Sequence, residues 1–144
     1  MKGILFRGKR TDRDKWVQGY IIVAEKDTPY IIPSKSWAHA PRNSHSMYSS
    51  NFYRVGPETV GQYTGLTDKN GTKIFEGDIV NRMFYFGLPV LSVVTFINGA
   101  FGLEWNRGKV KEFSAFTSIC NCTYEVIGNI YDNPELLKGG ADDE

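Results

Sequence analysis

The sequence predicts a mainly β protein, and three observations support this prediction. Its 144 residues include 9 Phe, 8 Tyr and 3 Trp, 20 aromatic residues in all, beside 15 glycines. This mixture favours strands and turns over helices. Between residues 74 and 131, about five apolar segments recur every ten residues or so, as in a small barrel or sandwich. No segment has the length and the apolar period of an ordinary helix.

In the first half of the chain, β-branched and aromatic residues predict four strands. These strands are expected at residues 3–7, 16–24, 30–32 and 52–55. Residues 8–14 form a basic and polar turn between the first two strands, and Pro33 ends the third. Residues 34–51 are rich in serine and show no periodicity, which predicts a long loop.

The second half alternates strands with short turns. Strands are expected at residues 62–66, 73–75, 78–86, 90–97, 101–105, 110–113 and 124–131. Asn70-Gly71 and Asn98-Gly99 indicate hairpin turns, because both residue types tolerate a positive φ. Asn133 can cap a single helical turn over residues 134–138, and an acidic tail follows at residues 139–144.

Targeting signals are absent from the sequence. The apolar stretch at residues 4–6 is much shorter than the core of a signal peptide, and no apolar run approaches the ~18–20 residues of a membrane helix. Two cysteines cannot form a disulfide-rich scaffold. We therefore expect a cytoplasmic protein with free thiols and no membrane partner.

The overall charge argues against a strongly basic nucleic-acid-binding protein, because 17 basic and 16 acidic residues leave a formal net charge of +1. The charges are unevenly placed, however. Residues 1–20 hold six basic and two acidic residues, and residues 132–144 hold five acidic residues and one lysine. These opposite ends could attract each other within one chain or between subunits.

No motif for catalysis, metal binding or cofactor binding is complete. Residues 65–73 lack the spacing of a phosphate-binding loop, and no Gly-x-Ser-x-Gly elbow is present. Cys120 and Cys122, with His39 and His45, lack the usual spacing of a structural zinc site. We therefore expect no catalytic residue, no metal and no cofactor, although an enzyme with an unrecognised site stays open as a third alternative.

Two segments hold the best candidates for contact with a nucleic acid or a protein partner. Lys9, Arg10 and Arg13 combine charge with the ring of Trp16, and Trp37 and Arg42 do the same in the serine-rich loop. Charged hairpin tips are common on soluble proteins, so these residues could equally form a solvated surface.

Two longer motifs resemble the YopX family of phage and prophage proteins. They are PETVGQYTGLTDKNGTKIFEGDIV at residues 57–80 and YEVIGNIYDNPELL at residues 124–137. The resemblance implies a temperate phage or prophage of a Gram-positive bacterium, and it implies an SH3-like β-barrel in the C-terminal half, over residues 74–131. It carries over no catalytic residue. Its motif residues are mainly turn and strand-entry types, which predicts a structural role for Gly65, Asn70, Gly71, Gly77, Asp78 and Asn133.

These observations predict an N-terminal β-segment (residues 1–60) packed on the YopX-like barrel segment (residues 61–138). The leading functional hypothesis is a phage-encoded, non-enzymatic accessory protein that binds copies of itself and an unknown host or phage protein. A nucleic-acid-binding β-barrel is the alternative. Self-association is favoured by the many aromatic residues and by two expected strand edges, at residues 4–6 and 110–113.

Overall fold

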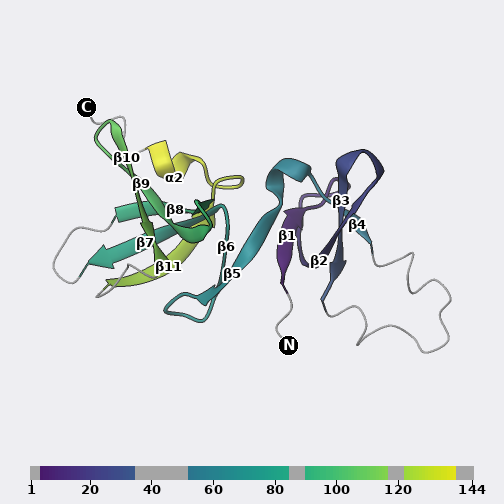
Figure 1. Ribbon diagram of the computed structural model, residues 1–144, viewed down its shortest axis with the longest axis horizontal. Helices are drawn as coiled ribbons and strands as arrows, with labels where there is room; N and C mark the ends of the chain where they lie inside the picture. Colours follow the sequence, from purple (N-terminus) through teal and green to yellow (C-terminus); the bar gives the residue numbers. More distant parts are fainter. Residues whose placement is uncertain (1–3, 35–51, 85–89, 117–121, 139–144) are drawn as a thin grey trace. The chain divides into compact units, whose positions relative to one another are not determined.

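The computed structural model describes residues 4–34, 52–84, 90–116 and 122–138 (Figure 1). The protein is mainly β, as predicted, with antiparallel sheets of six and five strands and a short C-terminal helix, α2 (Glu135–Lys138). The chain divides into two compact units, Met1–Tyr63 and Thr64–Glu144. Among the described residues, no helix is long and apolar enough to span a membrane.

The N-terminal unit is a small antiparallel sheet. Its elements are β1 (Phe6–Lys9), β2 (Trp16–Ala24), η1 (Glu25–Asp27), β3 (Thr28–Pro33), β4 (Tyr53–Arg54), η2 (Pro57–Thr59) and the start of β5 (Gly61–Thr67). Its strands are ordered β4-β3-β2-β1-β5. Strand β2 has the predicted bounds, because its β-branched and aromatic residues suit a pleated surface.

One strand edge predicted for this unit is wrong. Residues 4–6 were expected at an edge, but β1 is paired on both sides: Phe6 lies opposite Gly19 of β2 and opposite Gln62 of β5. The chain returns alongside β1 after η2, which the local sequence does not indicate.

The sheet of the N-terminal unit bends until β4 meets the end of β1. Arg10 and Val55 form an antiparallel bridge, and the Gly56 amide donates to the Lys9 carbonyl at 2.9 Å. A Cβ atom on Gly8 would lie 2.7–2.9 Å from the Val55 side chain, so only glycine fits at this approach. Ile31 and Val55 are fully buried on the concave side of the sheet.

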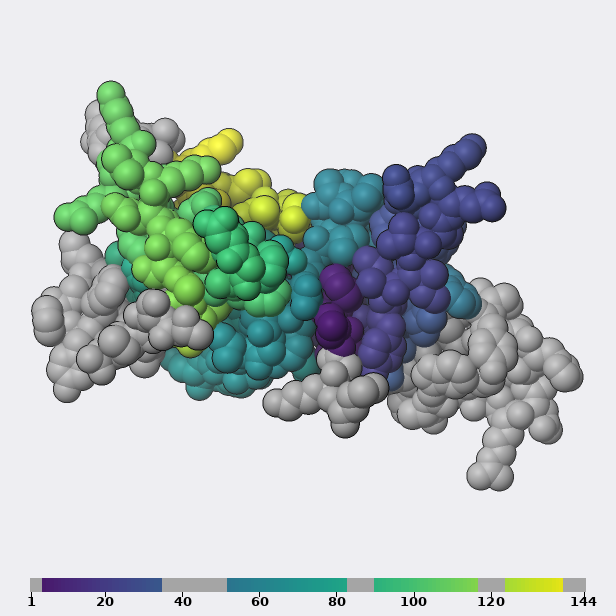
Figure 2. All heavy atoms as spheres, in the orientation of Figure 1, coloured from purple at the N-terminus to yellow at the C-terminus, as the bar shows by residue number. Residues whose placement is uncertain are grey.

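The C-terminal unit contains β6 (Lys73–Phe75) and a five-stranded sheet. The strands of this sheet are β7 (Asp78–Phe84), β8 (Val90–Ile97), β9 (Ala100–Arg107), β10 (Val110–Ala115) and β11 (Cys122–Asn129), in the order β10-β9-β8-β7-β11. Its core is Ile74, Val80, Val94 and Leu103, against which Phe116, Tyr124 and Val126 pack. The β9–β10 hairpin projects from the unit, in light green (Figure 2).

The turns of this unit differ in their backbone conformation. Asn98 and Gly99 have φ values of 52° and 82°, as the predicted hairpin turn requires. At Asn70-Gly71, only the glycine has a positive φ, of 81°, because Asp68 holds this loop from within. The two Asn-Gly pairs therefore form different turns.

The structure contains the strands of the predicted SH3-like barrel but shows no closure of the barrel among the described residues. No pairing closes β10 on β11 in the part of the chain that is described, so the strand order is that of an open sheet. The rings of Phe116, just after β10, and Tyr124, on β11, lie 5.6 Å apart. The two ends of the strand order therefore approach each other through side chains.

Candidate functional site

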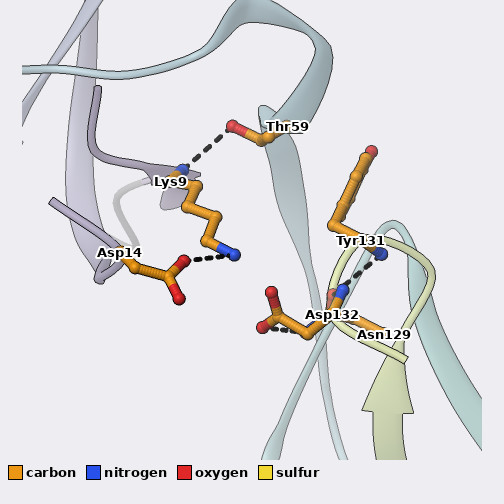
Figure 3. Close-up of polar contacts among 6 residues, drawn as sticks. All are labelled: Lys9, Asp14, Thr59, Asn129, Tyr131 and Asp132. Atoms are coloured by element: carbon orange, nitrogen blue, oxygen red, sulfur yellow. Dashed lines mark hydrogen bonds and ion pairs between the residues drawn. The ribbon is translucent and has the colours of Figure 1, made fainter. Parts of the chain in front are cut away.

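The basic turn between β1 and β2 holds two of its cations in ion pairs. Lys9 Nζ lies 2.6 Å from Asp14 Oδ1 (Figure 3), and Arg10 makes two bonds to Asp12, of 2.8 and 2.6 Å. The hydrogen bond between Arg10 and Asp12 raises the pKa of the arginine and lowers that of the carboxyl group. The turn therefore supplies its own counter-ions to two predicted contact residues.

Aromatic rings lie against these two cations and against Arg7. The Arg7 guanidinium lies 4.8 Å from the centre of the Trp16 ring, and Lys9 Nζ lies 5.9 Å from it. Arg10 stacks at 4.1 Å over Tyr53. Arg7 is only 8% exposed, and Trp16 is half-buried. Trp16 therefore packs against Arg7 and Lys9 of its own unit, and only part of its ring is exposed to solvent.

The structure describes one of the three predicted contact residues that remain. Arg13 is exposed in the turn. Trp37 and Arg42 lie outside the described residues, as do His39, His45 and Cys120. Within the ranges that the structure describes, no group of three His, Cys, Asp or Glu side chains could hold a metal ion.

Register places a surface on the N-terminal unit that the sequence analysis missed. Residues opposite each other in an antiparallel pair share one face of the sheet. One face, called the outer face below, is opposite to the side that buries Ile31 and Val55. Its positions on β1 to β4 are Arg7, Lys9, Trp16, Gln18, Tyr20, Ile22, Ala24, Thr28, Tyr30, Ile32 and Arg54.

The exposed part of the outer face lies on β2, β3 and β4. Tyr20 lies opposite Ile32, and Ile22 lies opposite Tyr30, which in turn lies opposite Arg54. Tyr20 and Ile22 are 43% and 41% exposed, Arg54 is exposed, and the other two are half-buried. Apolar side chains and one cation therefore form a continuous solvent-accessible patch across three strands.

The predicted turn motif forms a hydrogen-bonded network in the C-terminal unit. Asp68, only 7% exposed, accepts bonds of 2.9 Å from the Asn70 and Thr72 amides at Oδ1 and from the Val126 amide at Oδ2. Burial raises the pKa of the Asp68 carboxyl, but these three amides outweigh it and hold the pKa below its ordinary value. Asn70 Nδ2 donates to Glu125 Oε2 at 2.8 Å.

Other members of the motif stabilise backbone at strand ends. Gly65 and Gly77 have φ values of 88° and 87°, and Asp78 Oδ2 accepts the Phe75 amide at 2.8 Å. Asn133 Oδ1 accepts the Asn129 amide at 3.2 Å. Asn129 Oδ1 in turn accepts the amides of Tyr131 and Asp132 (Figure 3). Asp78 and Asn133 thus bond to backbone amides, whereas Asn70 bonds to the side chain of Glu125.

Comparison with solved structures shows a shared fold. The crystal structure of YopX from Bacillus subtilis has 15% sequence identity and a TM-score of 0.57, over 96% of this chain and 98% of that one. Protein EF1440 from Enterococcus faecalis has 23% identity and a TM-score of 0.48, over 95% of this chain and 99% of that one. No curated protein matches the chain.

Comparison with family models confirms the resemblance seen in the two sequence motifs. The model described as YopX protein matches residues 5–138, which include both motifs and both units. The chain therefore belongs to the YopX family.

Proposed function

We propose that this protein is a phage- or prophage-encoded, non-enzymatic accessory protein that acts by binding in the host cytoplasm. The observation that carries the proposal is the outer face of the N-terminal unit. Its positions include apolar and aromatic side chains and no carboxylate, and its exposed cation is Arg54, because Arg7 is buried and Lys9 is paired with Asp14. Exposed apolar residues gathered on one face of a small domain are typical of a contact surface.

The bonds of the buried carboxylates support a non-enzymatic role. General acid–base chemistry needs a carboxyl group that can reach a substrate. Asp68 and Asp78 are 7% and 1% exposed and accept backbone amides. The carboxylates of Asp12 and Asp14 bond to neighbouring cations of their own turn.

Self-association is part of the proposal. In the C-terminal unit, Val110 on β10 is 60% exposed and Phe96 on β8 is 52% exposed. Strand β10 ends the strand order of its sheet, which supports the edge expected at residues 110–113. We also propose an SH3-like curl for this sheet, supported by the contact between Phe116 and Tyr124.

The binding surface can be tested with two matched variants. Tyr20→Ser with Ile22→Ser removes the exposed apolar residues of the outer face, whereas Val23→Ser changes a neighbour that is 59% exposed on the opposite face. Each purified variant is immobilised beside the wild type and exposed to host lysate, with and without nuclease. Bound protein is identified by mass spectrometry and bound nucleic acid by staining.

We expect the wild type and Val23→Ser to retain the same partner and the double variant to lose it. The surface assignment is wrong if the double variant, shown to be folded by circular dichroism, retains all that the wild type retains. Finding no specific partner with the wild type would also count against the proposal.

A further inference from the structure

We infer that the ligand of the outer face is a single-stranded nucleic acid, an inference that rests on the proposal that this face binds. Tyr20 and Tyr30 are diagonal neighbours on adjacent strands, and the Cα atoms of such neighbours lie about 7–8 Å apart. Sheets that bind single strands stack two or three bases on aromatic side chains of one face. The two tyrosines lie on one face of the sheet, as such stacking requires.

The exposure of Tyr20 and Tyr30, and the residues next to them, are compatible with base stacking on both rings. Tyr20 is 43% exposed, and Tyr30 is half-buried beside it. Their cross-strand partners are Ile32 and Ile22, which offer apolar contact to bases and sugars without competing hydrogen bonds. A base stacked on each ring would cover apolar surface that is now exposed to water.

The charges on this face favour a polyanion over an apolar peptide. Arg54 is exposed and lies directly opposite Tyr30, where it can contact a phosphate next to a stacked base. None of the outer-face positions on β1 to β4 is a carboxylate. The carboxylates of Glu25 and Asp27 belong to η1, beyond the end of the β2–β3 ladder, with Lys26 between them.

A single strand fits this face better than a duplex. A duplex hides the faces of its bases and offers mainly phosphates, whose binding requires many cations. The exposed patch provides one cation, and the whole chain has a net charge of only +1. Stacking on rings therefore has to supply most of the affinity, and only unpaired bases can stack.

The contact residues inferred from the structure differ from those predicted from the sequence. The contact residues predicted from the sequence were Lys9, Arg10, Arg13, Trp16, Trp37 and Arg42, but Lys9 and Arg10 are ion-paired with Asp14 and Asp12. Replacing Lys9 and Arg10 with alanine should therefore change the affinity less than twofold. Replacing Tyr20 should have a much larger effect.

Fluorescence anisotropy with the full-length chain tests the inference. The probes are a fluorescein-labelled 20-nucleotide oligo-dT, the corresponding oligo-U and a 20-base-pair duplex, each at several salt concentrations. The variants are Tyr20→Ala, Tyr20→Phe, Arg54→Gln, the Lys9→Ala and Arg10→Ala pair, and Val23→Ser as a control. Circular dichroism verifies that each variant is folded.

We expect both single strands to bind more tightly than the duplex. Tyr20→Ala should raise the Kd by about 5- to 140-fold, because stacking on one ring contributes about 1–3 kcal/mol. Tyr20→Phe keeps the ring and should stay within twofold of the wild type. Arg54→Gln should reduce the slope of log K against log salt by about 0.7, the value for one phosphate contact on a single strand.

Three outcomes would overturn the inference. They are no binding of either single strand at low salt, equal binding of the duplex, and an unchanged Kd in Tyr20→Ala. If a host protein is still lost from the Tyr20→Ser, Ile22→Ser variant in the capture experiment, the proposed function stands and only the ligand class is wrong. If neither experiment responds to outer-face variants, both proposals fail.

Discussion

Asp68→Asn should selectively destabilise the C-terminal unit. The carboxylate accepts three backbone amides at 2.9 Å, two at Oδ1 and one at Oδ2. An asparagine with its oxygen at the Oδ1 position would keep the bonds from Asn70 and Thr72 without their charge assistance. Its amide nitrogen would then face the Val126 amide, so two donors would oppose each other.

The structure gives the size of this effect. Hydrogen bonds to a charged group contribute about 1.5–3 kcal/mol each, against about 0.5–1.5 kcal/mol for neutral ones, and a buried amide left without an acceptor costs about 1–3 kcal/mol. Two bonds lose their charge assistance and the Val126 amide loses its acceptor, which together predict a loss of about 3–6 kcal/mol in the free energy of unfolding at pH 7. Urea denaturation, followed by circular dichroism, measures it.

The acid dependence provides a second readout. The pKa of Asp68 is lower in the folded protein than in the unfolded chain, so the unfolded state binds more protons near the ordinary aspartate pKa of about 3.9. The stabilisation is therefore fully present above this pH and is lost as the pH falls through the folded pKa. Stability of Asp68→Asn should fall less steeply than that of the wild type below about pH 4.

Asp14→Asn is the matched control, since it also replaces a carboxylate with an amide. Asp14 pairs with Lys9 from a side chain that is 86% exposed, and such surface pairs contribute little. Equal effects of the two substitutions, or an acid slope unchanged by Asp68→Asn, would refute the role given to Asp68.

Three further predictions concern glycines and assembly. Gly71→Val should cost more than ~1 kcal/mol from its positive φ alone, since no atom lies within 4 Å of the added Cβ; an unchanged melting temperature would contradict this. Gly8→Ala should cost about 1–3 kcal/mol through its clash with Val55, and a double-mutant cycle with Val55→Ala should show a coupling that relieves part of this cost. Static light scattering should give a mass above the 16.3 kDa of one chain at micromolar concentration, and the monomer mass throughout a dilution series would exclude self-association.

Local sequence signals predicted individual strands and turns well. The strand at residues 16–24 was predicted with its observed bounds, because a dense apolar run ends in charged residues on both sides. The Asn98-Gly99 turn follows from two residues that tolerate a positive φ. The YopX family assignment from two motifs was confirmed over residues 5–138.

Nonlocal pairing accounts for what the sequence did not predict. The central position of β1 depends on β5, which returns only after residue 60. The outer face was missed because strand β2 is apolar at successive positions, so no alternation separates its two sides. Tyr20 and Ile22 share a face in any strand, but only the register with β3 adds Tyr30 and Ile32 to that face. Likewise, the charge of Lys9 and Arg10 was visible, but their bonds to Asp14 and Asp12 depend on how the turn folds.

The bridge between Arg10 and Val55 also identifies a place where this protein can be engineered. Strands β3 and β4 pair through Tyr30 and Arg54, and β4 is held again where Val55 meets Arg10. The end of β3 and the start of β4 are thus held next to each other by pairing with neighbouring strands. An affinity tag or a reporter peptide inserted between residues 34 and 52 should therefore leave both folded units intact.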